Sequence, residues 1–236
     1  MPSIAILLAA GSGQRMQGQV EDKILASING LPALVYSLKA FARSRVIDSY
    51  LIVYRDEAQK NAIEAIIAAH GFSHLKIQVV LGGAERQLSV INALNAIDGN
   101  CDYVFVHDCA RPCIHTEAIK DVYSAVQEDQ AASLAHPVVD TIKRIETVGV
   151  LRKISLEDLD RSRLWAMETP QAFAFKRILT AYQNVIKKKL TITDDSAAVA
   201  TIGLKTTLIP NKHPNPKLTT PTDLAYIEHL LKIPNS

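Results

Sequence analysis

The sequence has few cysteines, little net charge and no long apolar run. Three cysteines among 236 residues, without a C-x-x-C pair, fit a reducing compartment better than a disulfide-stapled secreted scaffold. A net charge of +2 argues against a general nucleic-acid-binding protein. No apolar stretch approaches the roughly 20 residues that span a membrane, and the start lacks the positive n-region of a signal peptide. These absences predict a soluble cytoplasmic protein.

What the chain does contain is an alternation of apolar runs and amphipathic segments. We expect strands at 4–8, 50–53, 77–81, 103–106, 132–135 and 205–209. We expect helices at 34–42, 58–69, 88–97, 116–127, 175–187 and 193–202, with a last one starting at Thr220-Pro221-Thr222-Asp223. This βαβ order predicts one α/β domain over residues 1–236, with a mostly parallel sheet covered by helices on both faces.

A glycine-containing loop follows the first expected strand. Gly11, Gly13 and Arg15 lie within five residues, so that backbone N–H groups and a guanidinium can face one anion. The G-x-x-x-x-G-K-[ST] pattern of a Walker loop is absent, and Met16 replaces the third small residue of a dinucleotide fingerprint. The loop therefore predicts a phosphate-binding site of a third kind, and with it a nucleoside triphosphate ligand; the alternative is an ordinary turn.

Two further loops follow expected strands and point to the same edge of the sheet. Residues 82–89 hold a glycine pair, an arginine and a serine, and residues 107–112 hold Asp108 and Arg111. Ligands of open parallel sheets lie beyond the carboxyl ends of the strands. Asp108 offers hard oxygens to Mg²⁺, and Lys23 offers a cation to phosphate. No general base is evident, which fits an acceptor that is itself an ionised phosphate held by Arg111, Arg161 and Lys217.

The loop around Asp108 admits a second interpretation. His107, Cys109, Cys113 and His115 place four potential zinc ligands within nine residues. Four ligands rarely converge over so short a segment, and small buried side chains are the more ordinary explanation of the cysteines. We therefore favour the phosphate site over the zinc site.

After residue 137 the chain becomes charged, with scattered apolar residues. Residues 141–145 and 150–154 flank Gly149 and predict a two-stranded arm within 138–163. An isolated hairpin is barely stable in water, so we expect the arm to dock on a second copy of the chain. The alternative is a hairpin folded back on its own sheet.

Short motifs in a fixed order now carry a resemblance that runs nearly end to end. They are AAGSGQRM at 9–16, GGAER at 82–86, HDCARP at 107–112, DTIK at 140–143, TPQ at 169–171 and NPKLT at 215–219. With them the chain resembles the 2-C-methyl-D-erythritol 4-phosphate cytidylyltransferases of the non-mevalonate isoprenoid pathway. The resemblance implies a Rossmann-like α/β fold and a homodimer with arm exchange. It also implies an Mg²⁺-dependent reaction of CTP with methylerythritol phosphate, giving a CDP-alcohol and pyrophosphate.

The resemblance also assigns residues. Those expected to bind CTP are Ala9, Ala10, Gly11, Ser12, Gly13, Gly83, Ala84, Ser89, Asp108 and Cys109, with Asp108 also on the metal. Those expected to act in catalysis are Arg15, Lys23, Thr141, Arg161 and Lys217. Those expected to hold the acceptor are Arg111, Thr141, Arg161 and Thr169, with Thr141 and Arg161 supplied by the neighbouring subunit's arm.

The chain departs from the family pattern at four places. Leu8 replaces a proline, Asp22 and Ile24 replace the neighbours of the lysine, Ala84 replaces an acid, and Cys109 replaces an alanine. None of these changes removes a proposed charge. Two other functions stay open: a cytidylyltransferase acting on ribitol 5-phosphate, and a nucleotide-binding module without catalysis.

Overall fold

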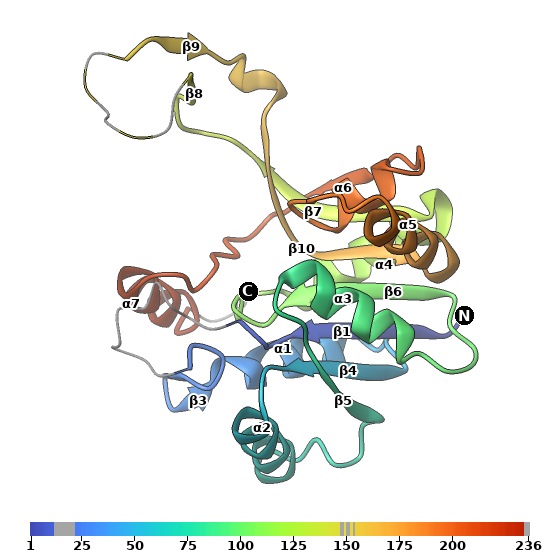
Figure 1. The fold of residues 1–236 in the computed structure, drawn as a ribbon. Helices are drawn as coiled ribbons and strands as arrows, with labels where there is room; N and C mark the ends of the chain where they lie inside the picture. Colours follow the sequence, from blue (N-terminus) through green and yellow to red (C-terminus); the bar gives the residue numbers. More distant parts are fainter. Residues whose placement is uncertain (12–21, 147–148, 150–151, 153, 234–236) are drawn as a thin grey trace.

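The computed structural model describes residues 1–11, 22–146, 149, 152 and 154–233, and its centre is a seven-stranded sheet (Figure 1). The strands are β1 (Ser3–Leu8), β4 (Ser49–Tyr54), β5 (Ile77–Leu81), β6 (Tyr103–Asp108), β7 (Ala131–Pro137), β10 (Trp165–Ala174) and β11 (Thr207–Pro210). Their order is β11-β7-β10-β6-β1-β4-β5. Neighbours pair in parallel except β10, which is antiparallel to both β6 and β7. The predicted mostly parallel sheet is confirmed.

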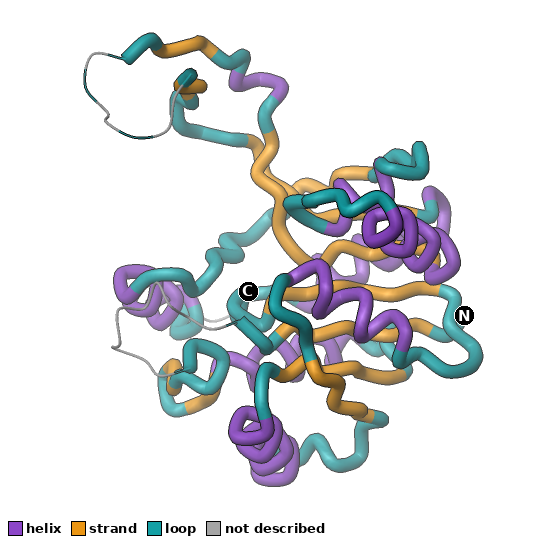
Figure 2. The backbone as a smooth tube through the Cα atoms, in the orientation of Figure 1, coloured by secondary structure: helices purple, strands orange, loops and turns teal. Residues whose placement is uncertain are grey.

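Helices cover both faces of the sheet (Figure 2). One face packs against α1 (Ala33–Ser44), α2 (Glu57–Ala69), α4 (Thr116–Asp129) and α7 (Pro221–Leu230). The other packs against α3 (Arg86–Asn95), α5 (Phe175–Lys187) and α6 (Asp195–Ala200). Because side chains alternate along a strand, Leu7 of β1 enters the first core and Ile6 the second. None of the described helices is long and apolar enough to cross a membrane.

Several elements were predicted with the right bounds. The strand at 77–81 and the helix at 175–187 match β5 and α5. The last helix begins as predicted: Thr220 and Asp223 form a reciprocal capping box, and Pro221 occupies the first turn. The predicted helix at 193–202 is shorter, because Asp194 caps α6 by accepting the Ala197 N–H.

Strand β10 was not predicted, although it lies between β6 and β7 in the centre of the sheet. Its sequence, WAMETPQAFA, mixes charged, amide and proline residues and so has no strand-like alternation. Pro170 is accommodated where the pairing with β7 shifts register between Met167 and Gln171. A short hairpin, β2 (Ser27–Ile28) and β3 (Leu31–Pro32), was also missed; Asn29 and Gly30 form its turn at positive φ.

The arm is present, but its second strand was predicted at the wrong place. All three residues of β8 (Lys143–Ile145) pair antiparallel with β9 (Leu156–Asp158), which follows the predicted range of 150–154. Val150, Leu151 and Lys153 lie outside the described residues, and Ile154 is not in a strand. Opposite charges on the two strands favour the observed pairing, because Arg144 forms an ion pair with Glu157 at 3.0 Å and Lys143 forms one with Asp158. The arm then returns through a 3₁₀ turn (Arg161–Arg163) and extends away from the sheet (Figure 1).

Candidate active site

A pocket of about 580 Å³ lies at the carboxyl ends of β1, β5 and β6. Because these strands are parallel, the loops that follow them meet at one edge of the sheet. Eight of the predicted site residues line the pocket: Ala10, Gly11, Lys23, Gly83, Ala84, Ser89, Asp108 and Lys217. The structure therefore brings together most of the residues that were predicted to bind CTP.

The glycine pair lets two loops approach closely on one side of this pocket. A Cβ on Gly82 would lie 2.9 Å from the Cβ of Ala10, and one on Gly83 would lie 2.3 Å from the Cβ of Leu88. The Gly83 N–H donates to the Ser89 hydroxyl at 3.0 Å. Any larger residue at either position would push the start of α3 away from the loop after β1.

The turn that carries Lys23 is held by its neighbour, Asp22. The buried Asp22 carboxylate accepts the Ile24 N–H at 2.9 Å and the Gln59 side-chain amide at 2.7 Å. Gln59 also donates to the Ala9 carbonyl at 3.0 Å, which ties this turn to the loop after β1. A Cβ on Gly11 would lie 3.7 Å from the Lys23 Nζ. The departure from the family pattern at Asp22 therefore anchors the lysine beside the glycine loop.

Asp108 is the central charge of the pocket. Lys217 Nζ lies 2.5 Å from one of its oxygens, and Arg86 Nε lies 3.4 Å from the other. Burial by itself raises the pKa of Asp108, but Arg86 and Lys217 outweigh it and hold that pKa well below its usual range. Arg86 in turn forms a bidentate pair with buried Asp195 at 3.1 and 2.7 Å. The site thus carries an ionised carboxylate between two fixed cations.

A second hollow of about 330 Å³ shares the wall formed by Arg86, Asp108 and Lys217. Arg111 and Thr169, both predicted to hold the acceptor, line it. Burial lowers the pKa of Arg111, and its buried Nε makes no hydrogen bond to a described residue. An unsatisfied buried donor costs about 1–3 kcal/mol, so an anionic ligand beside it would be favoured.

The comparisons with known proteins agree with this geometry. The family model for 2-C-methyl-D-erythritol 4-phosphate cytidylyltransferase matches residues 3–233. The chain belongs to this family. A curated relative from Dictyoglomus thermophilum, with the same description, is 36% identical over 97% of this chain and 96% of its own length.

Solved structures of the family share the fold. The 4-diphosphocytidyl-2C-methyl-D-erythritol synthase of Anaerococcus prevotii is 25% identical, with a TM-score of 0.84 and 98% of each chain covered. The Francisella tularensis 2-C-methyl-D-erythritol 4-phosphate cytidylyltransferase is 28% identical, with a TM-score of 0.79, over 98% of this chain and 100% of that one. The Rossmann-like α/β fold expected of a cytidylyltransferase is confirmed.

Of the remaining predicted residues that the structure describes, none lines this pocket, while Arg111 and Thr169 line the second hollow. Ser12, Gly13 and Arg15 lie outside the described residues. Ala9 and Cys109 are fully buried and donate their N–H groups to Val53 and Leu8 in the sheet. Their side chains are therefore parts of the core beneath the site.

Thr141 and Arg161 lie on the arm and line neither hollow of their own chain. Thr141 is exposed, and Arg161 donates from Nη1 to the Val139 carbonyl at 2.6 Å. An acceptor contact through these residues therefore requires an arm from elsewhere, or a large movement of this one.

No role was predicted from the sequence for three charged residues that line the pocket: Arg55, Glu85 and Arg86. Arg55 follows β4 and lies 3.4 Å from Asp22. Arg86 is the last residue of the GGAER motif, so the sequence could have indicated that it belongs to the site. Its partner Asp195 is 109 positions away, and Tyr182 also donates to Asp195 at 2.5 Å. No local pattern indicates that pair.

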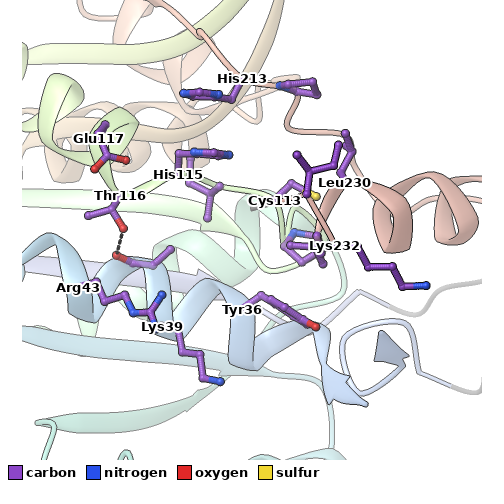
Figure 3. A pocket seen from close by; sticks show the side chains of 16 residues that line it. Tyr36, Lys39, Arg43, Cys113, His115, Thr116, Glu117, His213, Leu230 and Lys232 are labelled. Atoms are coloured by element: carbon purple, nitrogen blue, oxygen red, sulfur yellow. Dashed lines mark hydrogen bonds between the residues drawn. The ribbon is translucent and has the colours of Figure 1, made fainter. Parts of the chain in front are cut away.

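A third hollow, of about 570 Å³, lies between α1, residues 112–117 and the end of α7 (Figure 3). His115 and His213 stack there with ring centroids 3.9 Å apart, while Lys39 and Arg43 come from α1. None of the predicted site residues lines this hollow.

The zinc alternative lacks support, since no three His, Cys, Asp or Glu side chains in the described ranges are grouped as metal ligands. Burial raises the pKa of Cys113 to about 12.

Proposed function

We propose that the protein transfers the cytidylyl group of CTP to 2-C-methyl-D-erythritol 4-phosphate. An oxygen of the acceptor phosphate attacks the α-phosphorus, the bond from that phosphorus to the β-phosphate oxygen breaks, and pyrophosphate leaves. The observation that carries the proposal is the shared wall of Arg86, Asp108 and Lys217 between two adjacent hollows. A donor in one hollow and an acceptor in the other would react across this wall.

The site supplies charge rather than a base. The acceptor phosphate has a second pKa of about 6, so it is already ionised at neutral pH. The task is to hold two anions together and to stabilise the charge that develops on the α-phosphorus. Lys23 and Lys217 line the CTP pocket and Arg111 lines the neighbouring one, with Arg15 as a further cation. Fixed cations in a partly dry site lower the barrier electrostatically.

The donor set suits Mg²⁺. Asp108 is ionised, faces the pocket and is a hard oxygen ligand. Mg²⁺ is usually held by one or two carboxylates together with substrate phosphates and waters, so one aspartate suffices. Bound there, the ion would neutralise triphosphate charge. Asp108 would hold it, and Arg86 would keep that carboxylate in place.

We infer a homodimer in which residues 138–163 of each chain complete the acceptor site of the other. The exposed side chains of Val139, Ile142 and Leu156 support this, because water would otherwise surround apolar surface on a two-stranded arm. The exchanged arm would bring Thr141 and Arg161 to the acceptor phosphate.

The remainder of residues 1–236 forms the nucleotidyltransferase domain. Three free, buried thiols support a cytoplasmic location.

The test is pyrophosphate release when CTP, Mg²⁺ and methylerythritol phosphate are mixed with the protein. We expect release that depends on all three. Release with ribitol 5-phosphate alone would move the assignment to that acceptor. No release with either, together with CTP binding by calorimetry, would identify a nucleotide-binding module instead.

A further inference from the structure

A buried carboxylate, Glu168, lies behind the acceptor hollow and has no part in the chemistry described above. It belongs to β10, lines the hollow, and its side chain is only 3% exposed. A buried carboxylate is costly unless its oxygens are hydrogen-bonded, so its partners indicate what it does.

Three side chains from two segments, β7 and the loop formed by residues 211–217, converge on this carboxylate. His136 Nδ1, in β7, lies 2.5 Å from Oε1. The side-chain amides of Asn211 and Asn215 both donate to Oε2, at 2.8 and 2.9 Å. Glu168 therefore joins the central sheet to the loop formed by residues 211–217.

The 211–217 loop needs such an anchor. It has no helix or strand, and Pro214 and Pro216 have no N–H to donate. Main-chain hydrogen bonds fasten its two ends, from Asn211 to the Ala135 carbonyl at 2.9 Å and from Leu218 to the Ala110 carbonyl at 2.7 Å. Between them, the Asn215 side chain donates to Glu168 and to the Thr169 carbonyl at 3.1 Å.

The anchored loop involves two of the three cations that line the acceptor hollow, Arg111 and Lys217. The Asn215 carbonyl accepts a hydrogen bond from Arg111 Nη1 at 2.7 Å. Lys217, two residues further along the loop, donates from Nζ to the Asp108 carboxylate. Glu168 also supplies negative charge near Arg111, which is buried and has one nitrogen without a partner. A displaced loop would move the carbonyl that orients Arg111 and the backbone that carries Lys217.

We propose that Glu168 is a positioning residue: its buried carboxylate fixes the 211–217 loop so that Arg111 and Lys217 meet the acceptor phosphate in the reactive arrangement. This inference rests on the proposed function for its kinetic consequence. Its structural consequence, a fixed loop, does not depend on that function.

Two variants separate the carboxylate's hydrogen bonds from its charge. Glu168→Ala removes both. Glu168→Gln keeps one oxygen for the two asparagines, and its amide can donate to His136 Nδ1 in the other tautomer, so that only the charge is lost. The matched control is Lys212→Ala in the same loop, whose exposed lysine pairs with Asp121 on the surface.

We expect Glu168→Ala to raise the KM for the acceptor at least tenfold and to lower kcat, since a small misplacement can cost about 100-fold in rate. The KM for CTP should rise less, because Lys217 is the one displaced cation that also lines the CTP pocket. Glu168→Gln should raise the acceptor KM about threefold, a partial rescue. Amides of 211–218 should exchange hydrogen faster in Glu168→Ala, while Lys212→Ala should match wild type in every measurement.

Acceptor KM values within twofold of wild type in both variants would overturn the inference. A fall in kcat with both KM values unchanged would also overturn it, because it would show only a smaller folded fraction. Should Glu168→Ala fail to fold, Glu168→Gln decides by the same acceptor KM. An inactive wild-type protein would refute the proposed function, and hydrogen exchange would then still test the loop.

Discussion

The strand-end pocket and the arm are built in opposite ways. Around the pocket, buried carboxylates are linked by partly exposed cations: Arg86 joins Asp108 to Asp195, and Lys217 pairs with Asp108. On the arm, the ion pairs between Lys143 and Asp158 and between Arg144 and Glu157 are exposed. Exposed pairs contribute about 0–1 kcal/mol, whereas breaking a buried pair costs about 3–5 kcal/mol.

This difference indicates which half of the site one chain can form alone. The pocket at the carboxyl ends of β1, β5 and β6 has its described residues in place, held by the sheet and by buried side chains. In the proposed reaction the acceptor is held by Thr141 and Arg161, which belong to the arm that extends away from the sheet. Substitutions in each half of the site test this division.

The largest effect is expected from Lys23→Ala. Removing a cation that stabilises transition-state charge should lower kcat by about 100-fold or more. Pyrophosphate release at saturating CTP and acceptor measures it. Lys39→Ala, a lysine in the hollow of Figure 3, is the control and should retain wild-type turnover. Near-normal turnover in Lys23→Ala would remove this lysine from the mechanism.

Asp108→Asn should reduce turnover by about 100-fold, since it removes a metal-binding oxygen and leaves two cations without their carboxylate. The Mg²⁺ concentration for half-maximal rate should rise in parallel. Asp121→Asn, which changes an exposed pair with Lys212, is the control. An unchanged Mg²⁺ requirement in Asp108→Asn would exclude this carboxylate as the metal ligand.

Arg161→Ala should raise the KM for the acceptor about tenfold, because one charge-assisted hydrogen bond is lost. The KM for CTP should not change. Arg163→Ala, two positions along the exposed arm, serves as the control. Equal effects on both KM values would mean that the arm does more than hold the acceptor.

Co-expression of the Lys23→Ala and Arg161→Ala chains sharpens the comparison further. The rate is measured at an acceptor concentration well below the wild-type KM, where both single variants are slow. If arms are exchanged, a mixed dimer has one pocket with an intact lysine and an intact incoming arm, so the mixture is faster than either variant alone. If each arm serves its own chain, every pocket carries one defect and the rate of the mixture lies between those of its components.

The smallest effect concerns stability alone. Burial lowers the pKa of His107 to about 3, so it stays neutral in the folded protein while the unfolded chain takes up a proton below about pH 6.5. The free energy of unfolding should therefore fall by about 1.4 kcal/mol for each pH unit as the pH drops from about 6.5 toward about 3. Urea unfolding at about pH 7 and about pH 5 should show a flatter pH dependence for His107→Gln. An equal slope in the variant would assign the effect to other groups.

The fold was largely predictable because its core strands are short and apolar. Residues 4–8, 103–106 and 132–135 each lie inside the strand that forms there. β10 and β9 were missed for the opposite reason. β10 interrupts its apolar residues with Glu168, Pro170 and Gln171, and the buried side chains of Glu168 and Gln171 find their hydrogen-bond partners in β7 and other segments. β9 has three exposed residues and pairs through charge.

Local pattern and residue chemistry predicted most of the strands and helices in their order, the glycine-containing loop after β1 and the identities of the main charged residues. Which of these charges pair depends on the tertiary fold. Arg86 and Asp195 stand 109 positions apart, as do Asp108 and Lys217, and Glu168 reaches Asn215 across 47. No period or motif encodes such pairs, because they form only when the sheet brings its loops to one edge.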